Sequence, residues 1–289
     1  MMQIRTRQAL DALAFPLKRS GLVASASAPY AVLFAVQSGL TASAAGGWGP
    51  GAPLAFVTIL IAFAAFIPAL SAWTRAELGV PAGYGWSKGE TRLILVVLLV
   101  LALLFTVVGT ALLMLAFMLG ALAIIGAQRT GMTEAPEGFV NIFALFGTGE
   151  WIVAIVLIAA FAGFNIWLFA RLALSVPATL ARDQVQVLAA WPLSAGRVIQ
   201  MIILTVIAAA PGLALLTAFN FASAAAFGFF PASSSSAVGP DGARALGFAA
   251  VSFVYGLLKM AALGAPLAAL FARLFQVYDG ETRTQPETG

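Results

Sequence analysis

Long apolar runs, separated by short polar segments, dominate this chain. A helix needs about 20 apolar residues, at about 1.5 Å each, to cross the hydrocarbon core of a bilayer. Runs of this kind lie at Gly21–Leu40, Leu54–Trp73, Leu93–Ala127, Trp151–Arg171, Val198–Phe221 and Leu246–Phe275. The pattern predicts an all-α, polytopic membrane helical bundle with six transmembrane helices.

The third run, Leu93–Ala127, is too long for one upright crossing. It fits a helix that tilts, extends beyond the lipid, or breaks near Gly109. Two full spans here would move every later loop to the other side of the membrane. Arg171, Arg182 and Arg197 would then lie opposite most other basic residues. We therefore expect a single span, and the pattern leaves open whether its helix is continuous or broken.

Basic residues are distributed unevenly between the two sides of this topology. With six spans and a cytoplasmic N-terminus, 12 of the 15 Lys and Arg residues fall in cytoplasmic segments. They are Arg5, Arg7, Lys18, Arg19, Arg75, Lys88, Arg92, Arg171, Arg182, Arg197, Arg273 and Arg283. Since short cytoplasmic loops carry an excess of Lys and Arg, this distribution predicts that both termini are cytoplasmic.

Composition narrows the class of function. Hydrophobic residues make up 62% of the chain and charged residues 9%, so lipid is its main solvent. The chain has no Cys and no His, which excludes disulfides, Cys nucleophiles and His acid–base chemistry. A net charge of +4 fits contact with anionic lipid headgroups better than nucleic acid. We predict no catalytic residues, no cofactor and no metal site.

Three spans end in an Arg residue within similar stretches of sequence. "WTRAELGVPA" and "LFARLALSVPA" share the pattern Arg, two residues, Leu, a small residue, Val, Pro, Ala. "LFARLFQVYDG" repeats the first five residues of the second stretch. Arg75, Arg171 and Arg273 are therefore predicted to anchor the cytoplasmic helix ends at lipid phosphates, where they also complement the helix dipole. The similarity also indicates three parallel helical hairpins descended from one unit.

The polar segments divide the chain further. Residues 1–20 carry leucines at helical spacing opposite charged residues, which predicts an amphipathic helix at the membrane interface. Residues 21–278 form the six-span domain. Within it, residues 176–196 are predicted to be a cytoplasmic interfacial segment, with Trp191 at the membrane surface. Residues 279–289 are predicted to be a flexible C-terminal tail.

Lys259 is a charged residue within the sixth predicted span. A Lys in the middle of a span costs about 2.5–3.5 kcal/mol on insertion scales, so it needs a partner or a wet cavity. We expect it to snorkel outward or to bond to Tyr255, Asn165 or Asn220. The alternative is that it binds an anionic headgroup or substrate together with these residues.

The last span also carries a packing pattern. Small residues recur on one face at multiples of four, at Ser252, Gly256, Gly264, Ala268 and Ala272. Such a face lets another helix approach closely, either within the bundle or across a dimer. Pro266 is predicted to kink this span and to free the carbonyl of Ala262.

The fourth-to-fifth connection resembles a known layout. An Arg ends the fourth span, a Pro and a short helix follow, and "AAWPLSAGR" precedes the fifth span. This resembles the membrane domain of glycerophosphoryl diester phosphodiesterases and related six-span bacterial inner-membrane proteins of unknown function. The matching positions are Arg171, Pro177, Trp191, Leu193 and Gly196. The chain departs at Ala190, where that family usually has Ser, and at Ser194, where it usually has Thr.

The resemblance implies a bacterial inner-membrane location and leaves the function open. The activity of that family belongs to a separate soluble domain that binds a metal through Glu, Asp and His, so catalysis is not implied here. One hypothesis is a non-catalytic membrane protein that organises lipid or assists a membrane complex. Its partners would be anionic lipids, another membrane protein or a second copy. The other is a small transporter or lipid-handling protein with a polar path near Lys259.

Overall fold

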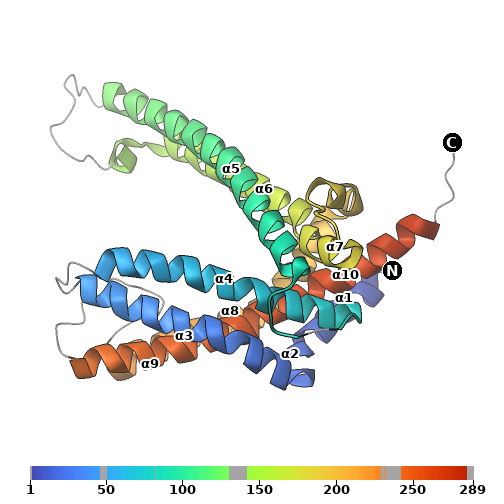
Figure 1. The fold of residues 1–289 in the computed structure, drawn as a ribbon. Coiled ribbons are helices and arrows are strands. Elements are labelled where there is room, and N and C mark those ends of the chain that lie inside the picture. The colour runs from blue at the N-terminus through green and yellow to red at the C-terminus, as the bar shows by residue number, and fades with distance from the viewer. Residues whose placement is uncertain are drawn as a thin grey trace.

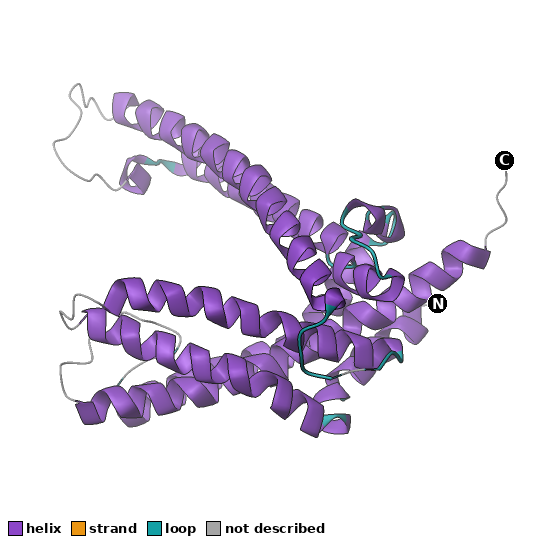
Figure 2. Cartoon of the chain, in the orientation of Figure 1, coloured by secondary structure: helices purple, strands orange, loops and turns teal. Residues whose placement is uncertain are grey.

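The chain is a helical membrane bundle. The computed structural model describes residues 2–45, 51–81, 83–129, 142–228, 231 and 242–284, and within them it contains helices and no strand (Figure 2). Six helices are long and apolar enough to cross a membrane. The predicted fold class is confirmed.

Each predicted apolar run lies inside one helical unit. In chain order these are α1 (Met2–Leu13), α2 (Phe15–Lys18), α3 (Ser20–Ala45), α4 (Gly51–Leu78), α5 (Lys88–Arg129), η1 (Ile142–Leu145), α6 (Thr148–Leu172), α7 (Ser175–Arg182), η2 (Leu188–Ala190), η3 (Pro192–Ser194), α8 (Val198–Phe227), α9 (Gly242–Lys259), η4 (Met260–Gly264) and α10 (Ala265–Thr284). The sixth span is continuous through α9, the π-helix η4 and α10.

Helix α5 is one continuous helix of 42 residues, about 63 Å long. Gly109 does not break it. Hydrocarbon offers no hydrogen-bond partner to backbone groups, so an apolar segment keeps its helical bonds even at a glycine. The question that the sequence left open is thus answered in favour of the unbroken helix.

The molecule opens like a V (Figure 1). Helices α5 and α6 lie side by side and diverge from α3, α4 and α9, and the two groups meet near α7 and α10. The main core lies around this meeting point, with Trp73, Leu274 and Tyr278 among its fully buried side chains. A second, small cluster joins the far end of α5 to the start of α6 through Leu119, Ala123, Phe146 and Ala154.

A π-helix lies where the kink at Pro266 was predicted. Proline lacks the N–H that would complete the α-helical pattern, and η4 ends two residues before it, at Gly264. Helix α8 approaches the bulge closely, because a Cβ added at Gly212 would lie 2.2 Å from the carbonyl oxygen of Ala262. A glycine is therefore required at this crossing.

The small residues of the last span serve internal contacts. A Cβ at Gly256 would lie 3.2 Å from Ala31 of α3, and one at Gly264 would lie 3.2 Å from the ring of Trp73 in α4. The remaining members of this face, Ser252, Ala268 and Ala272, are all buried. Of the two alternatives, packing within the bundle is confirmed for this face.

The N-terminal helices pack on the bundle by small and aromatic side chains. Ala9, Ala12 and Phe15 are buried in the main core, and α1 contacts α8 and α10. Leu10 and Leu17 stay exposed, at 57% and 83%. Helices α1 and α2 are thus attached to the bundle on one side, and their leucines Leu10 and Leu17 are exposed on the other.

The predicted tail needs a correction. Helix α10 continues to Thr284, so the first part of residues 279–289 is helical, whereas residues 285–289 lie outside the described part. The helix is held there because Asp279 pairs with Arg182 of α7 at 2.7 Å. The end of α10 and helix α1 lie at the same end of the bundle (Figure 1). The descent of the three hairpins from one unit stays a prediction.

Candidate functional site at the charged end of the bundle

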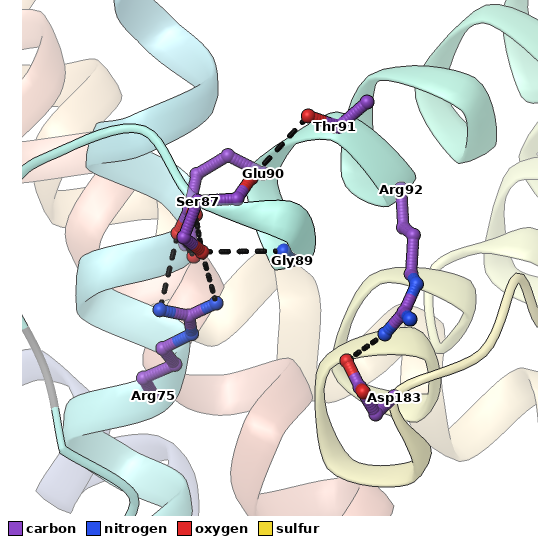
Figure 3. Close-up of polar contacts among 8 residues, drawn as sticks. Arg75, Ser87, Gly89, Glu90, Thr91, Arg92 and Asp183 are labelled. Carbon is purple, nitrogen blue, oxygen red and sulfur yellow. Dashed lines mark hydrogen bonds and ion pairs between the residues drawn. The ribbon is translucent and has the colours of Figure 1, made fainter.

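A buried carboxylate joins α4 to α5 (Figure 3). Glu90, in the first turn of α5, is 1% exposed, and its Oε1 lies 3.2 Å from Nη1 of Arg75 in the last turn of α4. The Ser71 hydroxyl donates to the same oxygen at 2.7 Å, and the Ser87 hydroxyl donates to Oε2. A buried charge is stable only when it is paired and hydrogen-bonded, and these groups meet that need.

A second ion pair ties α5 to α7. Arg92, one turn into α5, pairs with Asp183, which directly follows α7 (Figure 3). Asp183 has φ 51°, the left-handed conformation that a short Asp side chain tolerates at a helix end. The base of α5 is therefore held to α4 by Glu90 and to α7 by Arg92.

Arg171 lies between two tryptophans. Its guanidinium carbon is 5.5 Å from the ring centroid of Trp167 and 5.4 Å from that of Trp191. Its Nη1 donates to the carbonyl oxygen of Trp191 at 3.1 Å and to the Ser194 hydroxyl at 3.4 Å. A planar guanidinium suits such stacking and donation together. Arg171 therefore fastens the connection after α7 to helix α6.

Arg273 joins three helices. Its Nε and Nη2 donate to the two carboxylate oxygens of Glu77 in α4, at 2.8 and 3.2 Å, and its Nη1 lies 3.5 Å from Asp11 in α1. Two parallel bonds of this kind are the strong form of an ion pair. Together with Arg75 and Arg171, the sequence-predicted anchors thus bind groups of the protein, and each fastens one helical element to another.

The acidic partners were missed by sequence reasoning. Glu77, Glu90, Asp183 and Asp279 each pair with an Arg, and none of them was singled out. A local signal existed only for Glu90, because "SKGE" fits the Ser-x-x-Glu pattern that precedes an apolar helix. The other pairings join residues far apart in the chain and have no local pattern.

Lys259 contacts an aromatic group. Its Nζ lies 5.7 Å from the ring centroid of Phe34 in α3, a cation–π geometry. The ring of Phe34 in turn lies 5.9 Å from that of Tyr255. The structure thus brings Lys259 and Tyr255 to the same aromatic ring, that of Phe34.

The two asparagines predicted near Lys259 lie on other helices. Asn165 is on α6, and its amide donates to the carbonyl oxygen of Phe161 at 2.7 Å within that helix. Asn220 is on α8, which packs against α9. The four predicted residues therefore come from α6, α8 and α9, and the bond that Asn165 makes is local to its own helix.

An apolar cavity of about 320 Å³ lies beside the charged contacts. Its walls come from α4, the third to fifth turns of α5, the junction of α6 and α7, and the segment from Gly264 into α10. Thr74 and Ser175 supply the side-chain hydroxyls of the wall. The Ser175 hydroxyl donates to the carbonyl oxygen of Val187 at 3.3 Å. The Thr74 hydroxyl has no hydrogen-bond partner among the described residues.

The other side of α5 faces a more open groove of about 740 Å³. It lies between Leu103 and Thr106 of α5 and the loop that carries Val185 and Leu188. The base of α5 is thus flanked by apolar hollows on two sides. Within the described part of the chain, no three His, Cys, Asp or Glu side chains come together in a group that could hold a metal ion.

Comparison with known proteins adds no relative. No family model matches the chain, and no curated protein or solved structure matches it either. The resemblance to the phosphodiesterase membrane domain stays a prediction, so a function has to be argued from the geometry above.

Proposed function

We propose that this chain is a non-catalytic protein of the bacterial inner membrane that organises lipid, with both termini in the cytoplasm. The observation that carries the proposal is the divergence of α5 and α6 from the other spans (Figure 1). Only 11% of the apolar stretch of each of these two spans is buried within the protein, against 39% for that of α4. Two spans therefore contact lipid over most of their surface.

The exposed surface of α5 is apolar and aromatic. Phe105 and Phe117 are 82% and 79% exposed, and leucines lie between them. In a membrane such side chains contact hydrocarbon. The backbone hydrogen bonds are made within the helix, so the backbone needs no hydrogen-bond partner from the lipid. Because the hairpin of α5 and α6 diverges from the rest of the bundle (Figure 1), lipid acyl chains surround it, and these chains also contact α3 and α4.

The charged end of the molecule supports the cytoplasmic assignment. Arg75, Arg171 and Arg273 bind protein groups, but Arg19 and Lys88 at the same end are exposed. Each basic residue near an anionic leaflet contributes about 1 kcal/mol of attraction. These exposed cations, with the positive-inside pattern, favour contact between this end and anionic headgroups of the inner leaflet.

The alternatives have less support. A transport path near Lys259 would need polar side chains around the ammonium, and the contact described for it is the ring of Phe34. A role as an accessory subunit needs a protein partner, and it is decided by the experiment that follows.

The test is extraction of the full chain from its native membrane into polymer nanodiscs. Particle mass and lipid composition are measured by mass spectrometry against the bulk membrane. We expect particles without a stoichiometric foreign protein and with enriched anionic lipid. Replacing Arg19 and Lys88 together by Gln removes about 1 kcal/mol of attraction per charge and should lower this enrichment by up to about thirtyfold. Arg129→Gln, at the opposite end of α5, removes a charge that is 51% exposed and pairs with Glu150; it is the control for charge at the other end and should leave the enrichment unchanged.

Two results would contradict the proposal. The first is a lipid composition equal to that of the bulk membrane in both the native chain and the Gln variants. The second is a stoichiometric partner protein, which would make the chain a subunit of a complex. Lys259→Met in the same assay addresses the transport alternative, because the polar-path hypothesis requires a change in the retained lipid or ligand.

A further inference from the structure

We propose that the cavity between α4, α5, α7 and α10 seats one acyl chain of a membrane phospholipid. The inference rests on the proposed role in organising lipid, and it assigns a defined site to one lipid chain. The cavity measures about 320 Å³, within the size range of ligand sites, which begins at about 300 Å³.

The cavity is continuous with the lipid-facing surface. Leu101 of α5 and Phe169 of α6 both line it, and both are also exposed, at 46% and 51%. They lie within the apolar stretches of two membrane-spanning helices. The entrance therefore opens on hydrocarbon, so the molecules that reach it are lipids.

A rigid helix and a flexible chain differ in the space that they need. An α-helix with its side chains is a rod about 10 Å across. The helices around the cavity, α4, α5, α7 and α10, contact one another and leave no opening for such a rod. A flexible hydrocarbon chain bends to follow the walls and fits.

The chemistry of the walls disfavours a charged or strongly polar occupant. Thr74 and Ser175 supply the side-chain hydroxyls, and that of Ser175 already donates to the carbonyl oxygen of Val187. The Thr74 hydroxyl could offer such an occupant a hydrogen bond, but the rest of the wall is apolar, so the occupant would lose most of its hydration without replacement, which is unfavourable. An empty cavity is unfavourable as well, because the wall atoms would lack partners for dispersion contacts. A hydrocarbon chain satisfies both conditions.

The contacts at the charged end fix the distances between the helices that form the cavity walls. The pair of Arg75 with Glu90 holds α5 to α4, and the pair of Arg92 with Asp183 holds α5 to α7 (Figure 3). On the opposite wall, the π-helix ends at Gly264, where the backbone approaches α4. The spacing of the walls is thus fixed by polar contacts outside the cavity, and a π-helix often marks a functional position.

The test uses the full chain in nanodiscs of phosphatidylethanolamine and phosphatidylglycerol. A small fraction of the phosphatidylethanolamine carries a photoreactive diazirine near the end of one acyl chain. After irradiation and digestion, mass spectrometry locates the labelled residues. We expect labelling on the cavity walls of α10, around Leu267 and Phe271, above that on exposed α5 residues outside the cavity.

Two matched variants decide the question. Leu101→Trp fills the entrance and should lower labelling of α10 by about fivefold, equivalent to about 1 kcal/mol. Leu98→Trp changes a leucine of equal exposure, 49% against 46%, which lies outside the cavity, and should leave the labelling unchanged. If Leu101→Trp does not fold, the smaller filling substitution Val97→Phe takes its place, and circular dichroism confirms the helicity of each variant.

The outcomes separate this inference from the proposed function. Equal labelling in Leu101→Trp and the native chain, or an equal loss in Leu98→Trp, would overturn the acyl-chain site. The lipid composition retained on extraction from the native membrane is measured in parallel for the same variants. Persistent enrichment without cavity labelling would leave the lipid-organising role standing and reject the site, whereas cavity labelling without enrichment would do the reverse.

Discussion

The crossing of α8 and the π-helix predicts a clear effect of one methyl group. In Gly212→Ala, the new Cβ would lie 2.2 Å from the oxygen and 2.8 Å from the carbon of the Ala262 carbonyl. Ordinary contact begins at 3.4 Å, so the two helices must separate by about 1 Å. Backbone lies on both sides of the contact, and no rotamer change can relieve it.

The magnitude follows from two opposing terms. Overpacking a well-packed contact costs about 1–3 kcal/mol, and a contact between two backbones lies in the upper part of this range, at about 2–3 kcal/mol. Replacing a glycine inside a helix by alanine returns up to about 1 kcal/mol. We therefore expect Gly212→Ala to lower the free energy of unfolding by about 1–2 kcal/mol.

Gly163 of α6 provides the matched control. It also lies inside a spanning helix, but no atom lies within 4 Å of its added Cβ. Gly163→Ala should therefore be neutral or stabilising by up to about 1 kcal/mol. Unfolding of purified protein by sodium dodecyl sulfate in mixed micelles, followed by circular dichroism, measures both variants. Equal stability of the two variants would refute the close approach at Ala262.

Two further predictions concern the charged end. Arg75→Met and Glu90→Gln should each destabilise the protein by about 2 kcal/mol, below the 3–5 kcal/mol of a fully buried pair because Arg75 is 20% exposed. In the same titration the double variant should lose at least about 1 kcal/mol less than the sum, whereas additivity would show that the pair is not coupled. Arg171→Lys keeps the charge but loses the planar stack on both tryptophans. Hydrogen exchange in residues 188–196 should then rise about tenfold, equivalent to about 1.4 kcal/mol, and unchanged exchange would mean that Arg171 does not hold this segment.

The number and position of the spans could be predicted because length and apolarity decide them. Every apolar run read from the sequence lies inside its helix, and Pro266 marks the place of the π-helix. These are local properties. Lipid provides no hydrogen bonds, so an apolar stretch of about 20 residues has few alternatives to a helix.

The divergence of α5 and α6 could not be predicted from the sequence. In a soluble protein the apolar stripe of a helix shows which side is buried. Here the lipid-facing side is as apolar as the side that faces the bundle. Leu101, in the cavity wall, and Leu98, outside it, are the same residue type at nearly equal exposure.

The partners of the charged residues could be predicted only in part. Arg75, Arg171 and Arg273 stand out in the sequence, but their ligands come from distant segments, as in the pair of Arg273 with Glu77, 196 positions apart. Chain spacing contains no information about such contacts. The hydrogen-bond geometry shows that a guanidinium at a helix end joins helices where the sequence alone indicated contact with phosphates.

The unequal length of the spans has a mechanical consequence. Helix α5 has 42 residues, whereas α3 and α4 have 26 and 28. A bilayer presents one hydrocarbon thickness of about 30 Å to all of them, so the longest helix must extend beyond the hydrocarbon, incline beyond the average tilt of about 20°, or do both. Where tilt absorbs the excess length, a thinner membrane would incline α5 further, and a thicker one would bring it more upright. The angle between the hairpin and the rest of the molecule, and with it the width of the lipid entrance at Leu101, would then vary with membrane thickness.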